Sequence, residues 1–328
     1  MEVPYFSIIL LIGGLVGLGV GAELTINCSI KTAWRFGLSP FLIGLTLVSI
    51  GTSIPEMAIG IAGGIDRLKG IETSGIVVGN YIGSVLNQMT IILGICGLLG
   101  TLAVSKKTTK KIGSALIASL LLFFIIILDY KITVLEGFVL IIAYIGFISY
   151  LIFHKKKLES SEISGLKDKI RGFRVCKMEE PAHLDVVFLI VGIIVIGLGA
   201  DAVIMAGIEL ATFMNVEQSA IGLIFVGFGT GIPELIVSVR ALSKGDVSLS
   251  VGNLLGSSIT DILLSTGIGA VIAGFIIDEK TLWFNTPITI TMTLLALIFL
   301  MTGEKLDRKE SLLLITAYIF IAVFAFMI

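Results

Sequence analysis

The chain has 328 residues, of which 56% are hydrophobic and 14% are charged, against about 25% charged in a typical soluble domain. Its net charge of −1 gives no support for nucleic-acid binding. Its three cysteines, Cys28, Cys96 and Cys176, are too few and too widely spaced to predict a disulfide framework or a zinc cluster.

Apolar runs long enough to cross a hydrocarbon core of about 30 Å recur along the whole chain. In chain order, we expect ten membrane-spanning helices at about 5–27, 40–64, 73–101, 112–129, 133–153, 184–211, 217–242, 246–275, 282–301 and 311–328. Glycines, prolines and acidic residues interrupt four of these runs, at 40–64, 73–101, 217–242 and 246–275. The sequence therefore predicts an all-α polytopic membrane protein surrounded by lipid.

The basic residues divide the loops into two sets. Nineteen Lys and Arg residues fall in one set, and only Arg67, Lys69, Lys131 and Lys280 fall in the other. Basic loops stay on the cytoplasmic side of a membrane. We therefore expect a protein of the cytoplasmic membrane with both termini extracellular, and a basic cytoplasmic linker at 154–183.

The sequence repeats itself once. At a shift of 178 residues, segment 51–56 (Gly-Thr-Ser-Ile-Pro-Glu) falls on segment 229–234 (Gly-Thr-Gly-Ile-Pro-Glu). At a shift of 173, segment 79–84 (Gly-Asn-x-x-Gly-Ser) falls on segment 252–257. We therefore expect two repeats, 1–153 and 184–328, with five spans each. An odd number of spans inverts the second repeat, which is the architecture of many secondary transporters, with the binding site at the repeat interface.

Two glutamates, Glu56 and Glu234, stand in the middle of predicted spans. An unpaired charge there costs roughly 2.5–3.5 kcal/mol on insertion scales. No Lys or Arg stands mid-span, so a bound cation or a proton is the expected partner. The preceding prolines remove a backbone donor. They predict broken helices with free carbonyls around Thr52 and Thr230, which are tolerated at this depth only where they are buried or line a cavity.

The second motif adds side-chain oxygens. Ser84 and Gln88 are four residues apart, as are Ser257 and Asp261, so each pair shares a helix face. Asp261 is a third carboxylate in an apolar span. The two asparagines of this motif stand nearer the helix starts, where capping is an alternative use. An all-oxygen set of this kind suits Ca²⁺, Na⁺, Mg²⁺ or K⁺ rather than zinc or copper.

The paired Gly-Thr-x-x-Pro-Glu and Gly-Asn-x-x-Gly-Ser motifs, in two halves of five spans, resemble the α-repeats of the cation/calcium antiporter superfamily, and its sodium/calcium exchanger branch most closely. Proton/calcium exchangers typically read Gly-Asn-x-x-Glu at the first motif, and Thr52 speaks against that branch. The resemblance covers the whole transmembrane chain.

The resemblance implies that Glu56 and Glu234 are shared calcium ligands, with the backbone carbonyls of Thr52 and Thr230 beside them. It also implies sodium sites that use Ser53, Ser84, Ser257 and Asp261. Two positions depart from the pattern: Gly231 replaces the serine that matches Ser53, and Gln88 replaces a shorter Asn or Asp. Both departures bear on which ion is coupled and on how many sodium ions bind, and we keep Gln88 among the expected ligands.

The function that these observations predict is secondary antiport of Ca²⁺ for Na⁺ by alternating access. An exchanger of protons for calcium or another divalent cation is the alternative, because buried carboxylates can carry protons. An intramembrane aspartyl protease using Asp201 and Asp261 would leave the repeated glutamates unexplained. A passive channel would give currents without saturable exchange. We expect no enzymatic activity, no cofactor and a functional monomer.

Overall fold

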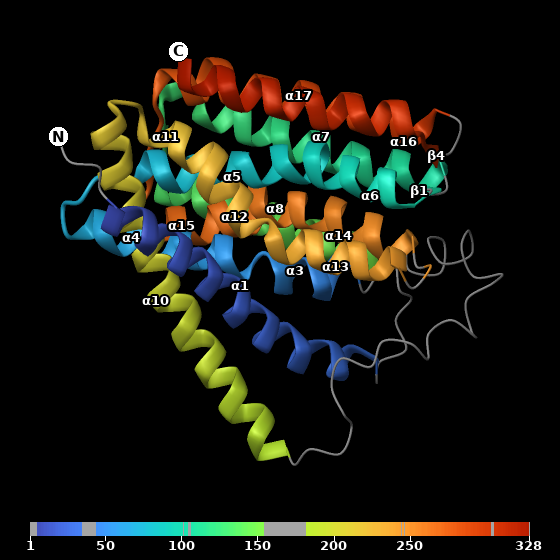
Figure 1. Cartoon of the computed structure of the whole chain (residues 1–328), viewed down its shortest axis with the longest axis horizontal. Coiled ribbons are helices and arrows are strands. Elements are labelled where there is room, and N and C mark those ends of the chain that lie inside the picture. Colours follow the sequence, from blue (N-terminus) through green and yellow to red (C-terminus); the bar gives the residue numbers. More distant parts are fainter. Residues whose placement is uncertain are drawn as a thin grey trace.

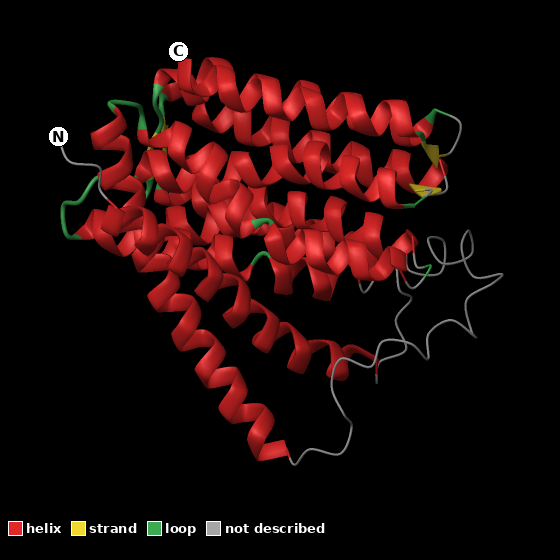
Figure 2. Cartoon of the chain, viewed as in Figure 1, coloured by secondary structure: helices red, strands yellow, loops and turns green. Residues whose placement is uncertain are grey.

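The computed structural model of this chain describes residues 5–34, 44–100, 102–103, 106–153, 182–243, 245, 247–302 and 305–327. The linker expected at 154–183 lies outside the described residues except for its last two positions, and Cys176 lies outside them as well. The described part of the chain is almost entirely helical (Figures 1 and 2).

The helical elements of the first repeat are, in order, α1 (Tyr5–Trp34), η1 (Gly44–Val48), α3 (Ser49–Thr52), α4 (Ile54–Leu68), α5 (Ser74–Asn87), η2 (Gln88–Ile92), α6 (Leu93–Leu99), α7 (Lys106–Ile126), η3 (Ile127–Asp129) and α8 (Val134–Phe153). Those of the second are α10 (Ala182–Met214), α11 (Gln218–Ile221), η6 (Gly222–Val226), α12 (Gly227–Thr230), α13 (Ile232–Ser243), α14 (Val247–Thr260), η7 (Asp261–Ser265), α15 (Thr266–Ala273), η8 (Thr281–Asn285), α16 (Thr286–Met301) and α17 (Arg308–Met327). Each expected span corresponds to one of these elements or to a continuous run of them, so the predicted fold class is confirmed.

Eight helices among the described residues are long and apolar enough to cross a membrane. The segment Tyr5–Gly21 of α1 is a shorter apolar helix. The run from η1 to α4 belongs to neither group, and it is broken at Ser53, as Pro55 predicts. A broken helix at membrane depth has to be covered by other protein segments.

Large apolar side chains cover the outside of the bundle, and polar side chains fill its centre. Phe6, Leu135 and Phe153 are each more than 70% exposed. Thirty-three polar or charged residues are buried among those described. A water-soluble protein rarely exposes so large an apolar surface. The distribution is therefore that of a chain whose outer surface faces lipid.

The repeat is visible in the irregularities of the helices as well as in their order. The π-helical turn η1 recurs as η6 at the shift of 178, and η2 recurs as η7 at the shift of 173. The helix breaks at Ser53 and Gly231 also correspond. Single π-helical turns inside α-helices frequently occur at functional sites. Here they flank the two repeated motifs in both halves.

Four short strands, which the sequence did not predict, join the two repeats. Strand β1 (Leu102–Ala103) pairs with β4 (Lys305–Leu306), and β2 (Lys131–Ile132) pairs with β3 (Phe275–Ile276), both antiparallel. Each pair takes one strand from each repeat. By the orientation predicted from the basic residues, the first pair lies at the cytoplasmic end of the bundle and the second at the extracellular end.

Helices α1 and α10 pack against each other and lie together along one side of the bundle (Figure 1). Glycines allow the close approach. A Cβ atom on Gly14 would lie 2.9 Å from the Gly199 carbonyl oxygen, and one on Gly199 would lie 2.8 Å from that of Gly14. Real Cβ atoms do not come this near to backbone oxygens, so side chains at either position would separate the two helices.

Candidate cation site between the two repeats

Two helix breaks bring the repeated glutamates into the centre of the bundle. Helix α3 ends at Thr52, and after Ser53 the helix α4 begins at Ile54 with Pro55 in its first turn. Because Pro55 has no N–H group, it cannot donate to the carbonyl of Gly51, which accepts instead from a backbone N–H at the end of α3. Glu56 follows in the first turn of α4 and is fully buried. The second repeat forms the same break between α12 and α13 and buries Glu234 in the same way.

Each repeat's threonine contacts the other repeat's second motif. Thr52 Oγ1 lies 3.0 Å from Ser257 Oγ and 3.3 Å from Asn253 Oδ1. Thr230 Oγ1 lies 3.2 Å from Ser84 Oγ and donates to Asn80 Oδ1 at 2.9 Å. The two sets of contacts are related by the internal repeat. The broken helix of one half is therefore docked on the α5 or α14 helix of the other.

The glutamates lie beside these contacts. Ser84 Oγ donates to Glu56 Oε1 at 3.2 Å. The Glu234 carboxylate lies next to the hydroxyls of Thr52 and Ser257. Glu56 Oε2 and both carboxylate oxygens of Glu234 are buried without a hydrogen-bond partner within the described residues. Three oxygens on two carboxylates are thus left for a ligand that is not protein.

Asp261 enters the site through Gln88. Gln88 Nε2 donates to Asp261 Oδ2 at 2.9 Å, and Ser258 Oγ donates to Gln88 Oε1 at 2.6 Å. Asp261 Oδ1 is buried without a partner among the described residues. Gln88 therefore lies at the site, as expected, but its amide is occupied at both ends. Its partner Ser258 was not among the expected site residues.

The structure brings all nine sequence-predicted site residues together. Every one of them is fully buried: Thr52, Ser53, Glu56, Ser84, Gln88, Thr230, Glu234, Ser257 and Asp261. They come from the helix breaks and from the α5–η2 and α14–η7 helices. Their role as ion ligands stays a prediction.

The two asparagines of the second motif belong to the site as well, and the alternative that they cap helices is wrong. Asn80 and Asn253 are buried inside α5 and α14, well past the helix starts. Their side-chain oxygens contact the threonines of the opposite repeat. The signal that could have found them is their spacing. Each stands four residues before the motif's serine and therefore on the same helix face.

The donor set fits a hard cation held by mixed oxygens. The described residues contain no group of three or more His, Cys, Asp or Glu side chains placed to hold a metal ion by themselves. An ion between Glu56 and Glu234 would therefore need hydroxyl, amide or carbonyl oxygens too, and these surround both glutamates. Calcium accepts six to eight oxygens of this kind with flexible geometry.

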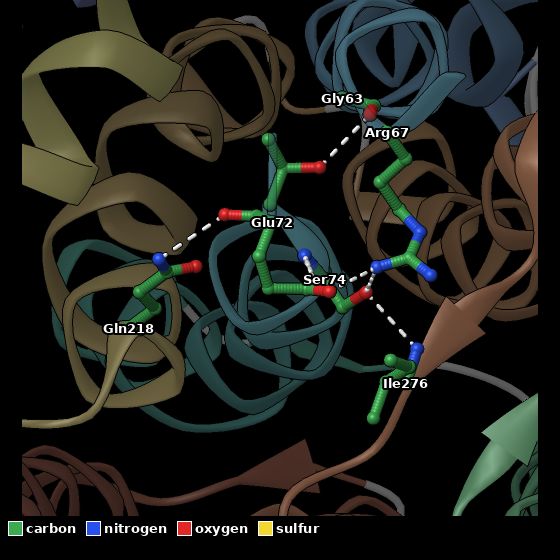
Figure 3. A network of polar contacts seen from close by, with 7 residues as sticks. Gly63, Arg67, Glu72, Ser74, Gln218 and Ile276 are labelled. Carbon is green, nitrogen blue, oxygen red and sulfur yellow. Dashed lines mark hydrogen bonds and ion pairs between the residues drawn. The ribbon is translucent and has the colours of Figure 1, made fainter. Parts of the chain in front are cut away.

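A second polar network lies at the end of the bundle where α4 joins α5 (Figure 3). Arg67 forms an ion pair with Glu72 and donates to Ser74 Oγ at 2.7 Å. The amide of Ile276 also donates to Ser74 Oγ, at 2.9 Å, and Gln218 Nε2 donates to the Glu72 carbonyl oxygen at 3.2 Å. We call these five residues the outer clasp. It ties the α4–α5 loop of the first repeat to β3 and α11 of the second.

The pair of aspartates that a protease would need is not assembled. Asp201 is exposed on α10, whereas Asp261 is fully buried in η7. Lys69, in the α4–α5 loop, lies near enough to Asp201 for the two charges to interact. Asp201 therefore belongs to the end of the bundle where α4 joins α5, away from the buried carboxylates.

Two inverted repeats, helix breaks at their interface and unpaired carboxylate oxygens at the centre define a membrane transporter of the cation-antiporter class. The profile of the family described as sodium/calcium exchanger protein matches residues 6–153 and 184–327. The chain belongs to this family.

Similar proteins extend over the whole chain. It is 30% identical over 351 residues to the sodium/calcium exchanger MaX1 of Methanosarcina acetivorans, an alignment covering 98% of this chain and 99% of the relative. It is 26% identical to the putative antiporter CaxA of Alkalimonas amylolytica, with 93% and 94% covered. Among solved structures, the sodium-calcium exchanger NCX_Mj superposes with a TM-score of 0.64 at 24% identity, over 97% of this chain and 98% of that one. That likeness concerns the fold.

Proposed function

We propose that this chain is a secondary antiporter that exchanges Ca²⁺ for Na⁺ across the membrane by alternating access. One observation carries the proposal. Glu56 and Glu234 are buried at corresponding helix breaks, and three of their four carboxylate oxygens have no hydrogen-bond partner among the described residues. Buried charges are tolerated in proteins when they are paired or bind metal ions.

Competition for one set of ligands would couple the two ions. Glu56, Glu234 and Asp261 lie close enough to repel one another when all are ionised. One Ca²⁺ or several Na⁺ would relieve this repulsion, but both loads together would leave an excess of positive charge in a region of low dielectric. Each ion would therefore leave before the other binds, as antiport requires.

Sodium is favoured over the proton as the coupling ion. The match to the family profile, and the name of the relative MaX1, both point to sodium/calcium exchange. A proton-coupled exchanger would give Ca²⁺ uptake into proteoliposomes when a pH gradient is imposed without sodium. We expect no such uptake, and we expect uptake when the vesicles are loaded with Na⁺ and diluted into sodium-free medium.

The site assignment is tested by Glu234→Gln in purified protein reconstituted into liposomes. The change keeps the shape of the side chain and removes the charge, so sodium-gradient-driven ⁴⁵Ca²⁺ uptake should be lost. Glu209→Gln makes the same change at an exposed position of α10 and should transport like the unmodified protein. Normal uptake by Glu234→Gln would refute the assignment.

We infer further that the protein resides in the cytoplasmic membrane with both termini outside. The excess of Lys and Arg in one set of loops supports this orientation. A cysteine placed at Lys131 in a variant without Cys176 should react with an impermeant thiol reagent from outside, and one at Lys106 should not. A monomer should suffice, because both repeats and both glutamates lie within one chain.

A further inference from the structure

Tyr81 carries a buried hydroxyl that the candidate cation site does not use. The residue lies in α5, three residues before Ser84, and it is fully buried. Its hydroxyl has no hydrogen-bond partner among the described residues. A buried tyrosine hydroxyl usually finds such a partner. This one is therefore held in place by packing rather than by a bond.

Two glycines make room for the hydroxyl. A Cβ atom built on Gly60 of α4 would collide with Tyr81 Oη, and one built on Gly269 of α15 would lie 2.6 Å from it. Helices α4 and α15 pack against each other. The ring of Tyr81 therefore reaches from α5 into the contact between two other helices, and its tip fills the space that side chains at both glycine positions would take. We call this place, formed by Gly60, Tyr81 and Gly269, the outer seam.

The outer seam lies between the buried carboxylates and the end of the bundle that carries the outer clasp. Gly60 follows Glu56 along α4, and Gly269 follows Asp261 along η7 and α15, each in the direction of that end. Helix α5 itself begins at the outer clasp. Tyr81 is near enough to both carboxylates for their charges to act on its hydroxyl. An ion that comes from this end therefore has to pass Tyr81.

The other repeat fills the corresponding place differently. At the shifts of 178 and 173 the counterparts are Ser238 for Gly60, Leu254 for Tyr81 and Cys96 for Gly269. Ser238 Oγ accepts from Asn253 Nδ2 at 3.1 Å and donates to the Ser250 carbonyl oxygen at 3.5 Å. The Ser250 hydroxyl has no hydrogen-bond partner among the described residues, but it lies beside the Cys96 thiol. This inner seam is therefore filled by short side chains, and Leu254 has neither a ring nor a hydroxyl to place in it.

The asparagines of the second motif reflect the same difference. Asn80 and Asn253 present their side-chain oxygens to the threonines of the opposite repeats in the same way. Asn253 Nδ2 also donates to Ser238, whereas Gly60 offers no hydroxyl and Asn80 Nδ2 has no partner among the described residues. The closed outer seam thus leaves the donors of Asn80 and Tyr81 unpaired. Water that enters this place would hydrate both.

We propose that Tyr81 closes the outer access route of the transporter: its hydroxyl, seated between Gly60 and Gly269, separates the buried carboxylates from the extracellular end, and the side chain leaves the outer seam when that end opens. A buried hydroxyl without a partner destabilises the closed state, and hydration removes this cost. The group that blocks the route therefore also favours its opening. This inference rests on the proposed function and on the orientation predicted from the basic residues. It adds the residue that controls access from one side.

The test places a cysteine behind Tyr81 and measures how fast it reacts from outside. Ser265 suits this purpose, because it lies between Asp261 and Gly269 along the helix and its carbonyl oxygen would be 3.4 Å from a Cβ atom on Gly60. The three native cysteines are first replaced by alanine. Ser265→Cys in this parent should then react with an impermeant methanethiosulfonate reagent added outside intact cells, in medium without sodium or calcium. Reaction from the cytoplasmic side alone would overturn the inference.

Two substitutions of Tyr81 should change this rate in opposite directions. Tyr81→Leu installs the residue of the inner seam and removes the ring, so the cysteine should react several times faster from outside. Tyr81→Phe keeps the ring and removes the unpaired hydroxyl, so the closed state gains stability and the reaction should become about tenfold slower, within the range that one unpaired buried hydroxyl represents. If Tyr81→Leu fails to fold, Tyr81→Phe still decides, because its packing is almost unchanged.

Ile92→Cys, at the counterpart of Ser265, is the control for the inner seam, with the reagent applied to inverted vesicles. Its rate should not rise in Tyr81→Leu. A rise from both sides would mean that the variant only loosens the bundle, and it would overturn the inference, as would an outside rate in Tyr81→Phe equal to or above that of the parent. Labelling does not require transport, so these results would leave sodium/calcium exchange standing. Absence of sodium-driven ⁴⁵Ca²⁺ uptake by the unmodified protein would instead overturn the proposed function.

Discussion

Gly83 is the position where α5 meets the broken helix of the second repeat most closely. A Cβ atom there would lie 2.2 Å from the Leu223 carbonyl oxygen and 2.7 Å from its carbonyl carbon. Ordinary contacts of this kind are 3.4–4 Å, so the backbone of η6 has to move by about 1 Å. We therefore expect Gly83→Ala to wedge the two repeats apart beside Ser84.

The magnitude follows from two opposing effects. Overpacking of this kind costs about 1–3 kcal/mol, and the upper end applies because backbone rather than a flexible side chain is in the way. Alanine recovers up to about 1 kcal/mol through its higher helix propensity. The expected net loss is about 2 kcal/mol in the free energy of unfolding, together with weaker Ca²⁺ binding because Ser84 contacts both Glu56 and Thr230.

Equilibrium unfolding by SDS in mixed micelles measures this loss. Gly146→Ala in α8 is the matched control, because a Cβ atom there would meet no atom within 4 Å. The control should be as stable as the unmodified protein or slightly more so. If Gly83→Ala unfolded at the same SDS fraction as Gly146→Ala, the close contact between α5 and η6 would be wrong.

Two further predictions concern the polar groups at the repeat interface. Asn253→Ala should destabilise the protein more than Asn80→Ala in the same SDS assay. The reason is that Asn253 Nδ2 donates to Ser238 Oγ at 3.1 Å, whereas Asn80 Nδ2 has no partner among the described residues. Equal losses in the free energy of unfolding would contradict these contacts. In the outer clasp, burial acts to raise the pKa of Glu72, but hydrogen bonds from Ser74 and the charge of Arg67 together hold it below 4.5. A depressed pKa gives a contribution to stability that is present above pH 4.5 and is lost as the pH falls through the folded-state value. Over that pH range the unmodified protein should therefore lose more stability than Glu72→Gln does. Parallel profiles of stability against pH for the two proteins would refute the role of this carboxylate.

The repeated motifs allowed much of the site to be predicted, because they are local in sequence. Pro55 and Pro233 indicate where the helices break, and the cost of a charge at membrane depth singles out the two glutamates. The ten expected spans also follow from local composition. Their ends differ from the observed helices by several residues in places, as at α7, where the lysine-rich segment Lys106–Lys111 extends the helix beyond its apolar part.

The contacts between the repeats could not be predicted, because they depend on three-dimensional placement. Nothing in the sequence near Thr52 indicates that it meets Asn253 and Ser257 rather than the corresponding residues of its own half. Gln88 presents the same difficulty, since its amide reaches Asp261 across the interface. The strands were missed for a different reason: two residues are too few for any alternation of polar and apolar side chains to be recognised.

The short strand pairs mean that the two halves of the chain form an obligate pair rather than two domains. Each half gives up one strand at either end of the bundle, so a half on its own would leave backbone donors and acceptors unpaired at both membrane surfaces. The threonines at the centre depend on the opposite half in the same way. Both ends of the bundle and its centre therefore depend on contacts that only the two repeats together can make.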